Sequence, residues 1–93
     1  MRGDLIRVLS AVEEKANELK MDGYQPDIVL FGTEAYEYVK AQVAEEFGGD
    51  EEVLELSGVK VRVLDELDGD GVVVDSTALG LGVGGARRFK VVK

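Results

Sequence analysis

The sequence predicts a small α+β domain in which a mixed central β-sheet is flanked by two helices. Two segments of the first half, residues 4–22 and 33–47, carry apolar residues at helical spacing. A continuous apolar run separates them at 28–31, and the second half is rich in alternating valines. The element order α-β-α-β-β-β is typical of an α+β or mixed-sheet domain. A chain of 93 residues suits one domain, spanning 1–93.

The clearest helix is predicted over residues 4–22. Its apolar residues recur at steps of four and three and so share one side of the helix: Leu5, Leu9, Val12, Ala16 and Leu19. Asp4 can accept free backbone N–H groups at its start, and Gly23 can adopt the left-handed conformation that ends a helix. Such a stripe must be covered, either by the rest of this domain or by a partner such as another copy.

Residues 28–31 are predicted to form a strand that is buried on both faces. Pro26 directs the preceding residue toward an extended conformation, and the run that follows is apolar with no polar side. Gly32 ends the strand. Thr33 is expected to cap a second helix that extends to about Phe47.

The second half is predicted to be mainly β-sheet. Valines at positions 59, 61 and 63 alternate with basic residues, as in a strand with one buried face. An acidic turn at 68–71 precedes another valine run, so residues 59–75 are expected to form a β-hairpin. A glycine-rich loop at 80–85 then leads to a last strand at 89–92.

Charge is negative overall and uneven along the chain. The net charge of −8 argues against nucleic acid as the main partner. Residues 44–75 hold eleven acids against two bases, whereas residues 76–93 hold four bases and no acid. This asymmetry is either an ordinary solvated surface or a sign that copies meet acidic face to basic tail. For the second case, the predicted subunit contacts are Gly80, Gly82, Gly84, Gly85, Arg87 and Arg88.

The composition also predicts a compartment. No apolar run approaches the ~20 residues that span a bilayer, and the first residues lack the apolar stretch of a secretory signal. We therefore expect a cytoplasmic protein with no membrane partner. The chain has one Asn, two Gln and no Cys, and 32% of its residues are charged. This composition is typical of a thermophile.

The residue types exclude most catalytic chemistry. The chain has no His and no Cys, so its hydroxyls lack the imidazole base that usually activates them. Zinc sites built from nitrogen and sulfur ligands are excluded for the same reason. We expect no enzymatic activity, no catalytic residue, no metal site and no cofactor.

Two motifs imitate ligand sites. Residues 66–71 match the start of a calcium loop, but Thr77 stands where the final bidentate glutamate belongs. Gly80, Gly82 and Gly85 match a dinucleotide fingerprint, but too few residues follow for the helix that it requires. A plain turn and a plain loop are the preferred interpretations. A weak cation site of low specificity in the turn is one open alternative, and an acid-dependent hydrolase with Mg²⁺ held by the loop over residues 65–75 is another.

Several segments, taken in order, resemble a known fold. Residues 23–31, with Gly-Tyr-Gln-Pro-Asp before the apolar strand, and the helix start at 35–39 resemble the opening of the A-domain of tailed-phage capsid proteins. Residues 57–63, 71–75 and 86–93 are similar to its later strands. This is the capsid fold named for phage Hong Kong ninety-seven. A chain with the A-domain pattern alone is most similar to the type four encapsulins of hyperthermophilic archaea.

The resemblance implies a structural function. It predicts a capsid-type A-domain that serves as a shell or scaffold component of an encapsulin-like nanocompartment, with copies of itself and a cargo enzyme as partners. The N-terminal arm, long β-hairpin loop and peripheral domain that interlock complete capsid subunits have no counterpart in the pattern. The alternative is a small, non-enclosing oligomeric binding or regulatory module of a hyperthermophile.

Overall fold

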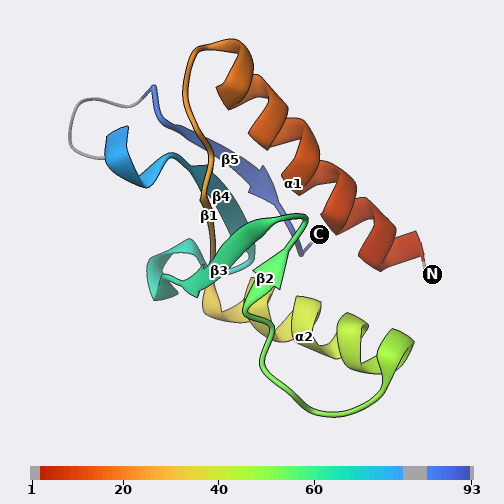
Figure 1. Ribbon diagram of the computed structural model, residues 1–93. Coiled ribbons are helices and arrows are strands. Elements are labelled where there is room, and N and C mark those ends of the chain that lie inside the picture. The colour runs from red at the N-terminus through yellow and green to blue at the C-terminus, as the bar shows by residue number, and fades with distance from the viewer. Residues whose placement is uncertain (1–2, 79–83, 93) are drawn as a thin grey trace.

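Two helices and a five-stranded sheet form the part of the chain that the computed structural model describes, residues 3–78 and 84–92. In chain order, and as labelled in Figure 1, the elements are α1 (Gly3–Met21), β1 (Ile28–Phe31), α2 (Thr33–Phe47), β2 (Glu55–Leu56), β3 (Val59–Val63), β4 (Asp70–Val74) and β5 (Ala86–Lys90). Two short 3₁₀ turns, η1 (Asp65–Leu67) and η2 (Ser76–Ala78), flank β4. The strands lie in the order β2-β3-β1-β4-β5, which confirms the predicted α+β fold with a mixed sheet.

The central strand β1 separates two strands that were predicted to pair with each other. β1 runs parallel to β3 and antiparallel to β4. The predicted hairpin over residues 59–75 is therefore wrong, and β3 pairs antiparallel with β2 instead. The connection from β3 to β4 passes the end of β1, where the Leu64 N–H donates to the Phe31 carbonyl (2.8 Å) and the Gly32 N–H to the Asp70 carbonyl (2.9 Å). An apolar strand gains most in the centre of a sheet, and this gain outweighs the advantage of a local hairpin.

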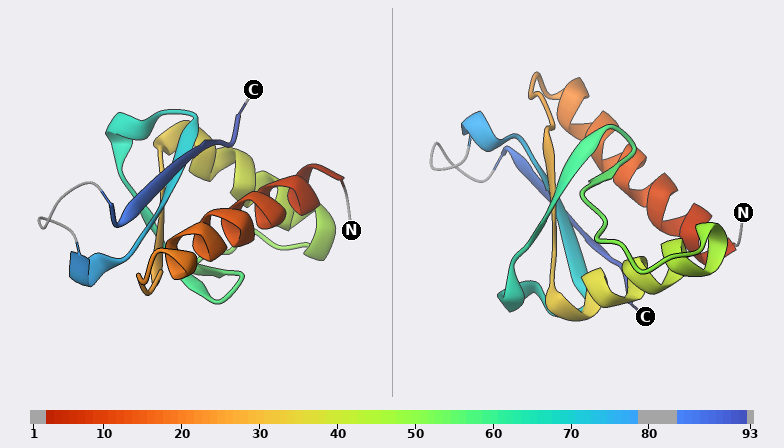
Figure 2. Two further views of the ribbon diagram at one scale, coloured as in Figure 1. Left: turned by 90° about the horizontal axis from the view of Figure 1, so that it is seen from above. Right: turned by 60° about the horizontal axis from the view of Figure 1, so that its bottom comes forward.

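Both helices pack on the same face of the sheet, as Figure 2 shows. α1 lies mainly across β4 and β5. The core joins α1 to the strand residues of this face: Val8, Val12, Ala16, Leu19, Val29, Phe31, Val61, Val73 and Phe89. Two alternatives were expected for the apolar stripe of α1, packing against the rest of this domain or against a partner. In the structure the stripe packs against the rest of this domain. Within the stripe, Val8 is buried where Leu9 was expected, and Leu9 is only half-buried.

The opposite face, which we call the open face, is covered by neither α1 nor α2. Its centre holds two residues of β1 and two of β4, and its margins hold basic residues of β3 and β5: Ile28, Leu30, Val72, Val74, Lys60, Arg62, Arg88 and Lys90. Val74 is buried, whereas Ile28, Leu30 and Val72 are half-buried. The sheet therefore has one fully covered side and one side whose apolar centre is partly accessible.

The start of α2 is held by backbone contacts and has no side-chain cap. The prediction that Thr33 caps α2 is wrong, because the N-cap residue is Gly32 and the Thr33 hydroxyl donates to Asp65 (2.7 Å). The Ala35 N–H donates instead to the Asp68 carbonyl (2.9 Å). This bond brings the Asp68 backbone against Gly32, where an added Cβ would lie 2.5 Å from the Asp68 carbonyl carbon. Glycine is the residue that leaves room for this approach.

Candidate functional site

Two aspartates join the loop before β1 to the end of β4. Asp27 accepts hydrogen bonds from the Ser76 N–H (2.8 Å) and from the Ser76 hydroxyl. Asp75, which is only 5% exposed, accepts from the Gln25 N–H (2.8 Å), the Thr77 N–H (3.0 Å) and the Thr77 hydroxyl (2.6 Å). Asp27 thus accepts hydrogen bonds from the segment after β4, and Asp75 accepts one from the segment before β1. We call these five residues the aspartate clamp.

The clamp makes stability depend on acid pH. Hydrogen bonds from the Gln25 N–H and then the Thr77 hydroxyl lower the pKa of Asp75 below its ordinary value of 3.8. The unfolded chain therefore binds this proton more readily, so the stabilisation is complete above the ordinary pKa and is lost as the pH falls through the lower folded pKa. We expect the wild-type Tm to fall as the pH drops below about 4.

Asp75→Asn is the variant that isolates this contribution. It is expected to have a lower Tm than wild type at pH 7 and a shallower fall of Tm in acid, because an amide does not titrate. Thermal denaturation followed by circular dichroism across the acid range measures both effects. Parallel Tm curves for the two proteins would contradict the role given to Asp75.

The glycines of the predicted subunit contact have packing roles within the domain. Four of the six predicted contact residues are described, and Gly80 and Gly82 lie outside the described residues. A Cβ at Gly84 would collide with the Tyr24 hydroxyl, and one at Gly85 would lie 2.8 Å from the Ala78 Cβ. These two glycines therefore allow the segment before β5 to approach Tyr24 and η2.

The two predicted contact arginines lie on opposite faces, because successive strand residues alternate. Arg87 shares the helix-covered face and forms ion pairs with Asp22 and with Glu18 (3.7 Å) of α1. Arg88 lies on the open face, where its side chain is 59% exposed and pairs with Asp70 (2.8 Å). Arg87 thus links β5 to the end of α1, whereas Arg88 is accessible to a partner.

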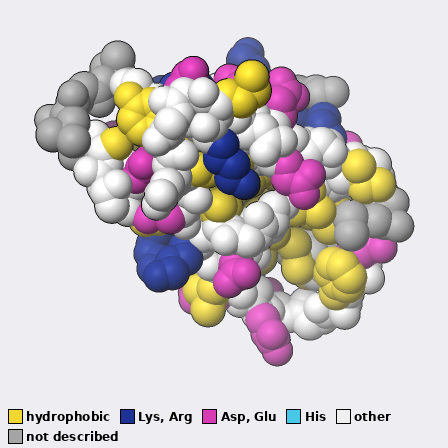
Figure 3. All heavy atoms as spheres, turned by 45° about the horizontal axis from the view of Figure 1, so that its top comes forward, with side chains coloured by type: hydrophobic (Ala, Val, Ile, Leu, Met, Phe, Trp, Pro, Cys, Tyr) yellow, Lys and Arg dark blue, Asp and Glu magenta, His cyan; other side chains and the backbone are white. Residues whose placement is uncertain are grey.

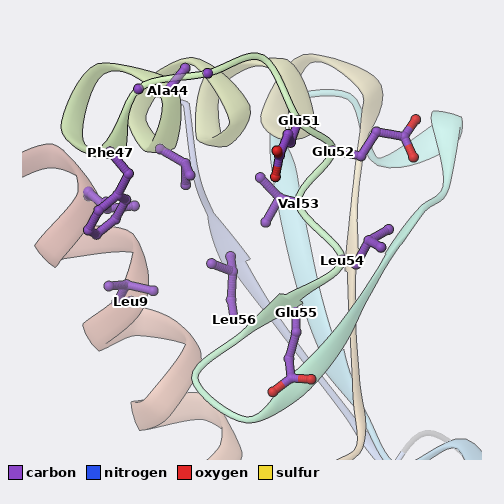
Figure 4. Close-up of a pocket in the computed structure, with 13 residues that line it drawn as sticks. Leu9, Ala44, Phe47, Glu51, Glu52, Val53, Leu54, Glu55 and Leu56 are labelled. Atoms are coloured by element: carbon purple, nitrogen blue, oxygen red, sulfur yellow. The ribbon is translucent and has the colours of Figure 1, made fainter.

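A groove of about 650 Å³ opens between α1, the end of α2 and β2. Its lining is mainly apolar with three glutamates: Leu5, Leu9, Val43, Ala44, Phe47, Gly48, Gly49, Glu51, Glu52, Val53, Leu54, Glu55 and Leu56. Phe47, Leu9 and Leu56 face one another across it (Figure 4). In the space-filling view of Figure 3, hydrophobic side chains gather on the right-hand side, with acidic side chains close by.

Sequence reasoning missed this groove. Phe47 and Leu54 are 69% and 65% exposed and line the same groove, an arrangement typical of an interaction surface. The signal that could have found Leu54 is its position in the acidic stretch after the second helix, where no periodic pattern demands an apolar residue. Phe47 gives no such signal, because it continues the four-residue spacing of Val39 and Val43.

The two ligand-like motifs take other forms in the structure. Residues 66–71 form the end of η1 and the start of β4, and no three Asp or Glu side chains in residues 3–78 and 84–92 are grouped to hold a metal ion. After Gly85 the chain continues as strand β5, whereas the dinucleotide motif needs a helix there. Neither helix in the described part is both long and apolar enough to cross a bilayer.

Comparison with known protein families covers nearly the whole chain. A family model described as "Putative type 4B encapsulin shell protein" matches residues 2–93. The chain belongs to this encapsulin family. The match confirms the predicted resemblance to encapsulins, and the family is described by a structural rather than a catalytic role. Among curated proteins, none matches this encapsulin-family chain.

In this encapsulin-family protein, two segments that predicted the resemblance meet in space. Residues 23–27 lead into β1, and residues 71–75 form most of β4 and the residue after it. The Asp27 N–H donates to the Val74 carbonyl (3.0 Å), and the aspartate clamp joins the two segments next to this bond. The acidic residue that ends each motif therefore stabilises the fold.

Proposed function

We propose that this protein is a structural subunit of an encapsulin-like shell that encloses or scaffolds a cargo enzyme in the cytoplasm, with no catalysis of its own. The observation that carries the proposal is the family match over residues 2–93, which includes both helices and all five strands. A match of this extent concerns the whole domain and not a single motif. The lack of His and Cys in the sequence also supports a structural role.

The surface of the domain supports self-association. Phe47 and Leu54 are exposed beside an apolar groove, a feature typical of protein interfaces. Opposite charges are segregated along the chain, as expected for a heterologous contact. We keep the six predicted contact residues as part of the proposal, with Arg88 as the one whose side chain is both charged and exposed: Gly80, Gly82, Gly84, Gly85, Arg87 and Arg88.

Two finer inferences belong to the same proposal. The segment order and the clamp motifs support a relationship to the A-domain of tailed-phage capsid proteins. The scarcity of Asn, Gln and Cys supports a hyperthermophilic archaeal source. A second candidate function, a small binding module that does not enclose its partner, is favoured by the groove alone.

Native mass separates the two functions. Light scattering on the full chain at low ionic strength is expected to show a particle far larger than the 10.1 kDa subunit. The particle should shrink or dissociate at high salt, because salt screens exposed charges beyond about 8–10 Å. A monomer at every salt and protein concentration would contradict the shell proposal and leave the binding module.

A further inference from the structure

The open face combines an apolar centre with two basic margins. One row across it consists of Arg62, Leu30, Val72 and Arg88, so that a cation stands at each end of two apolar side chains. Ile28, Leu30 and Val72 are only half-buried. A sheet with helices on one side usually presents polar residues on the other. The partly accessible apolar centre is therefore available to a partner that would cover it.

The strand order concentrates positive charge on this face. Four of the chain's eleven Lys and Arg residues lie there, at positions 60, 62, 88 and 90. Glu55 and Asp70 oppose them from β2 and β4, so the face keeps a net positive charge on a chain of net charge −8. Lys60 and Arg62 come from the most acidic segment of the sequence, and the sheet places them on the same face as the basic end of the chain.

A complementary surface lies on the helix side of the sheet and reaches the edge of β3, where Glu52 and Leu54 line one hollow with Arg62. Residues 47–54, which we call the acidic ridge, form one wall of the groove beside α1. The ridge carries exposed Phe47 and Leu54 together with exposed Glu51 and Glu52. It therefore offers apolar side chains flanked by negative charge, the counterpart of an apolar centre flanked by positive charge.

We infer that the open face of one copy docks the acidic ridge of a second copy. Phe47 and Leu54 would cover the apolar centre, and Glu51 and Glu52 would lie beside the basic margins. The inference rests on the proposed function, and it names the two surfaces through which copies associate. A nucleic acid fits the open face less well, because phosphates gain nothing from an apolar centre and the net charge of the chain repels a polyanion.

The positions of the two surfaces determine what kind of assembly follows. The ridge belongs to the side of the sheet that carries the helices, whereas the open face is the other side. The contact is therefore heterologous, and each added copy leaves one ridge and one face unoccupied. Such a contact continues beyond a dimer and closes only in a ring or shell, which agrees with a shell subunit.

Charge reversal on either surface tests the inference. Arg62→Glu with Arg88→Glu reverses the margins, and Glu51→Lys with Glu52→Lys reverses the ridge. Each double variant alone is expected to lose assembly, with association at least about 100-fold weaker in a light-scattering dilution series, because like charges then face each other. Circular dichroism verifies that each variant is folded.

Rescue makes the test specific. Mixing the two double variants should restore the particle, because the reversed margin of one then meets the reversed ridge of the other. A single chain carrying all four substitutions should also assemble. Loss of assembly without rescue in either experiment would overturn the inferred pairing.

Control variants change charge on the exposed side of α1. Glu13→Lys with Glu14→Lys changes the charge as much as the ridge variant does, and Lys20→Glu adds negative charge with half the change of the margin variant; both should assemble as wild type does. If wild type assembles and both reversed variants still assemble, the inference fails while the proposed function stands. If wild type is monomeric, the inferred pairing and the proposed function both fail. In that case, DNA binding by wild type that is lost in the Arg62→Glu, Arg88→Glu variant would show that the open face binds a nucleic acid.

Discussion

Gly32→Ala is expected to destabilise the domain by at least about 3 kcal/mol, at or above the upper range for overpacking a core. Gly32 has φ −65° and ψ 166°, a conformation that alanine adopts without backbone strain. The cost is therefore steric, because the new Cβ would lie 2.5 Å from the Asp68 carbonyl carbon. Backbone atoms on both sides cannot move apart without breaking the Ala35-to-Asp68 and Gly32-to-Asp70 hydrogen bonds.

Urea denaturation followed by circular dichroism measures this change in the free energy of unfolding. Gly3→Ala is the matched control, since nothing lies within 4 Å of its added Cβ, and it should change stability by less than about 0.5 kcal/mol. A Gly32→Ala protein as stable as this control would show that the approach of Asp68 is not required for folding.

The second large effect is expected from Val12→Asp, which should prevent folding altogether. Val12 is 0% exposed and lies in the core cluster formed by α1 and the sheet. Burial of an unpaired carboxylate costs several kcal/mol, on the order of 5, and small domains have only about 5–15 kcal/mol of stability in total. Loss of the cooperative thermal transition in differential scanning calorimetry is the expected result.

Asn17→Asp is the control for Val12→Asp, because it adds the same charge to an exposed position of the same helix. The free energy of unfolding of Asn17→Asp should lie within about 0.5 kcal/mol of the wild-type value. A Val12→Asp protein that still unfolds cooperatively at the wild-type temperature would mean that α1 is peripheral and that its stripe serves a partner.

Local patterns in the sequence were sufficient to predict the first three elements. The helix predicted over 4–22 is α1 at 3–21, and the strand and second helix agree with β1 and α2 at both ends. Each is defined by the periodicity of its own side chains, a property that needs no knowledge of neighbours. The small strand β2 escaped prediction because only Glu55 and Leu56 form it, too few residues to show a period.

Strand order could not be predicted in the same way. Alternation indicates which residues of β3 and β4 face the core, but it does not say that β1 lies between them. The same limit applies to the site. Arg87 and Arg88 are adjacent in sequence, yet only the pairing of β5 with β4 shows that they occupy opposite faces. The groove unites α1, α2 and β2, whose proximity is a property of the tertiary fold.

The packing of α1 on β4 and β5 also determines when the domain can fold during synthesis. α1 leaves the ribosome before β4 and β5, its main partners in the sheet, and the Arg7 side chain donates to the carbonyl of Val91 (2.6 Å), 84 residues further along the chain. Until β5 emerges, the apolar stripe of α1 lacks its main cover, so we expect no stable intermediate that ends at β3 or β4. The nascent chain is therefore expected to fold in one late step and to expose its first helix to chaperones until then.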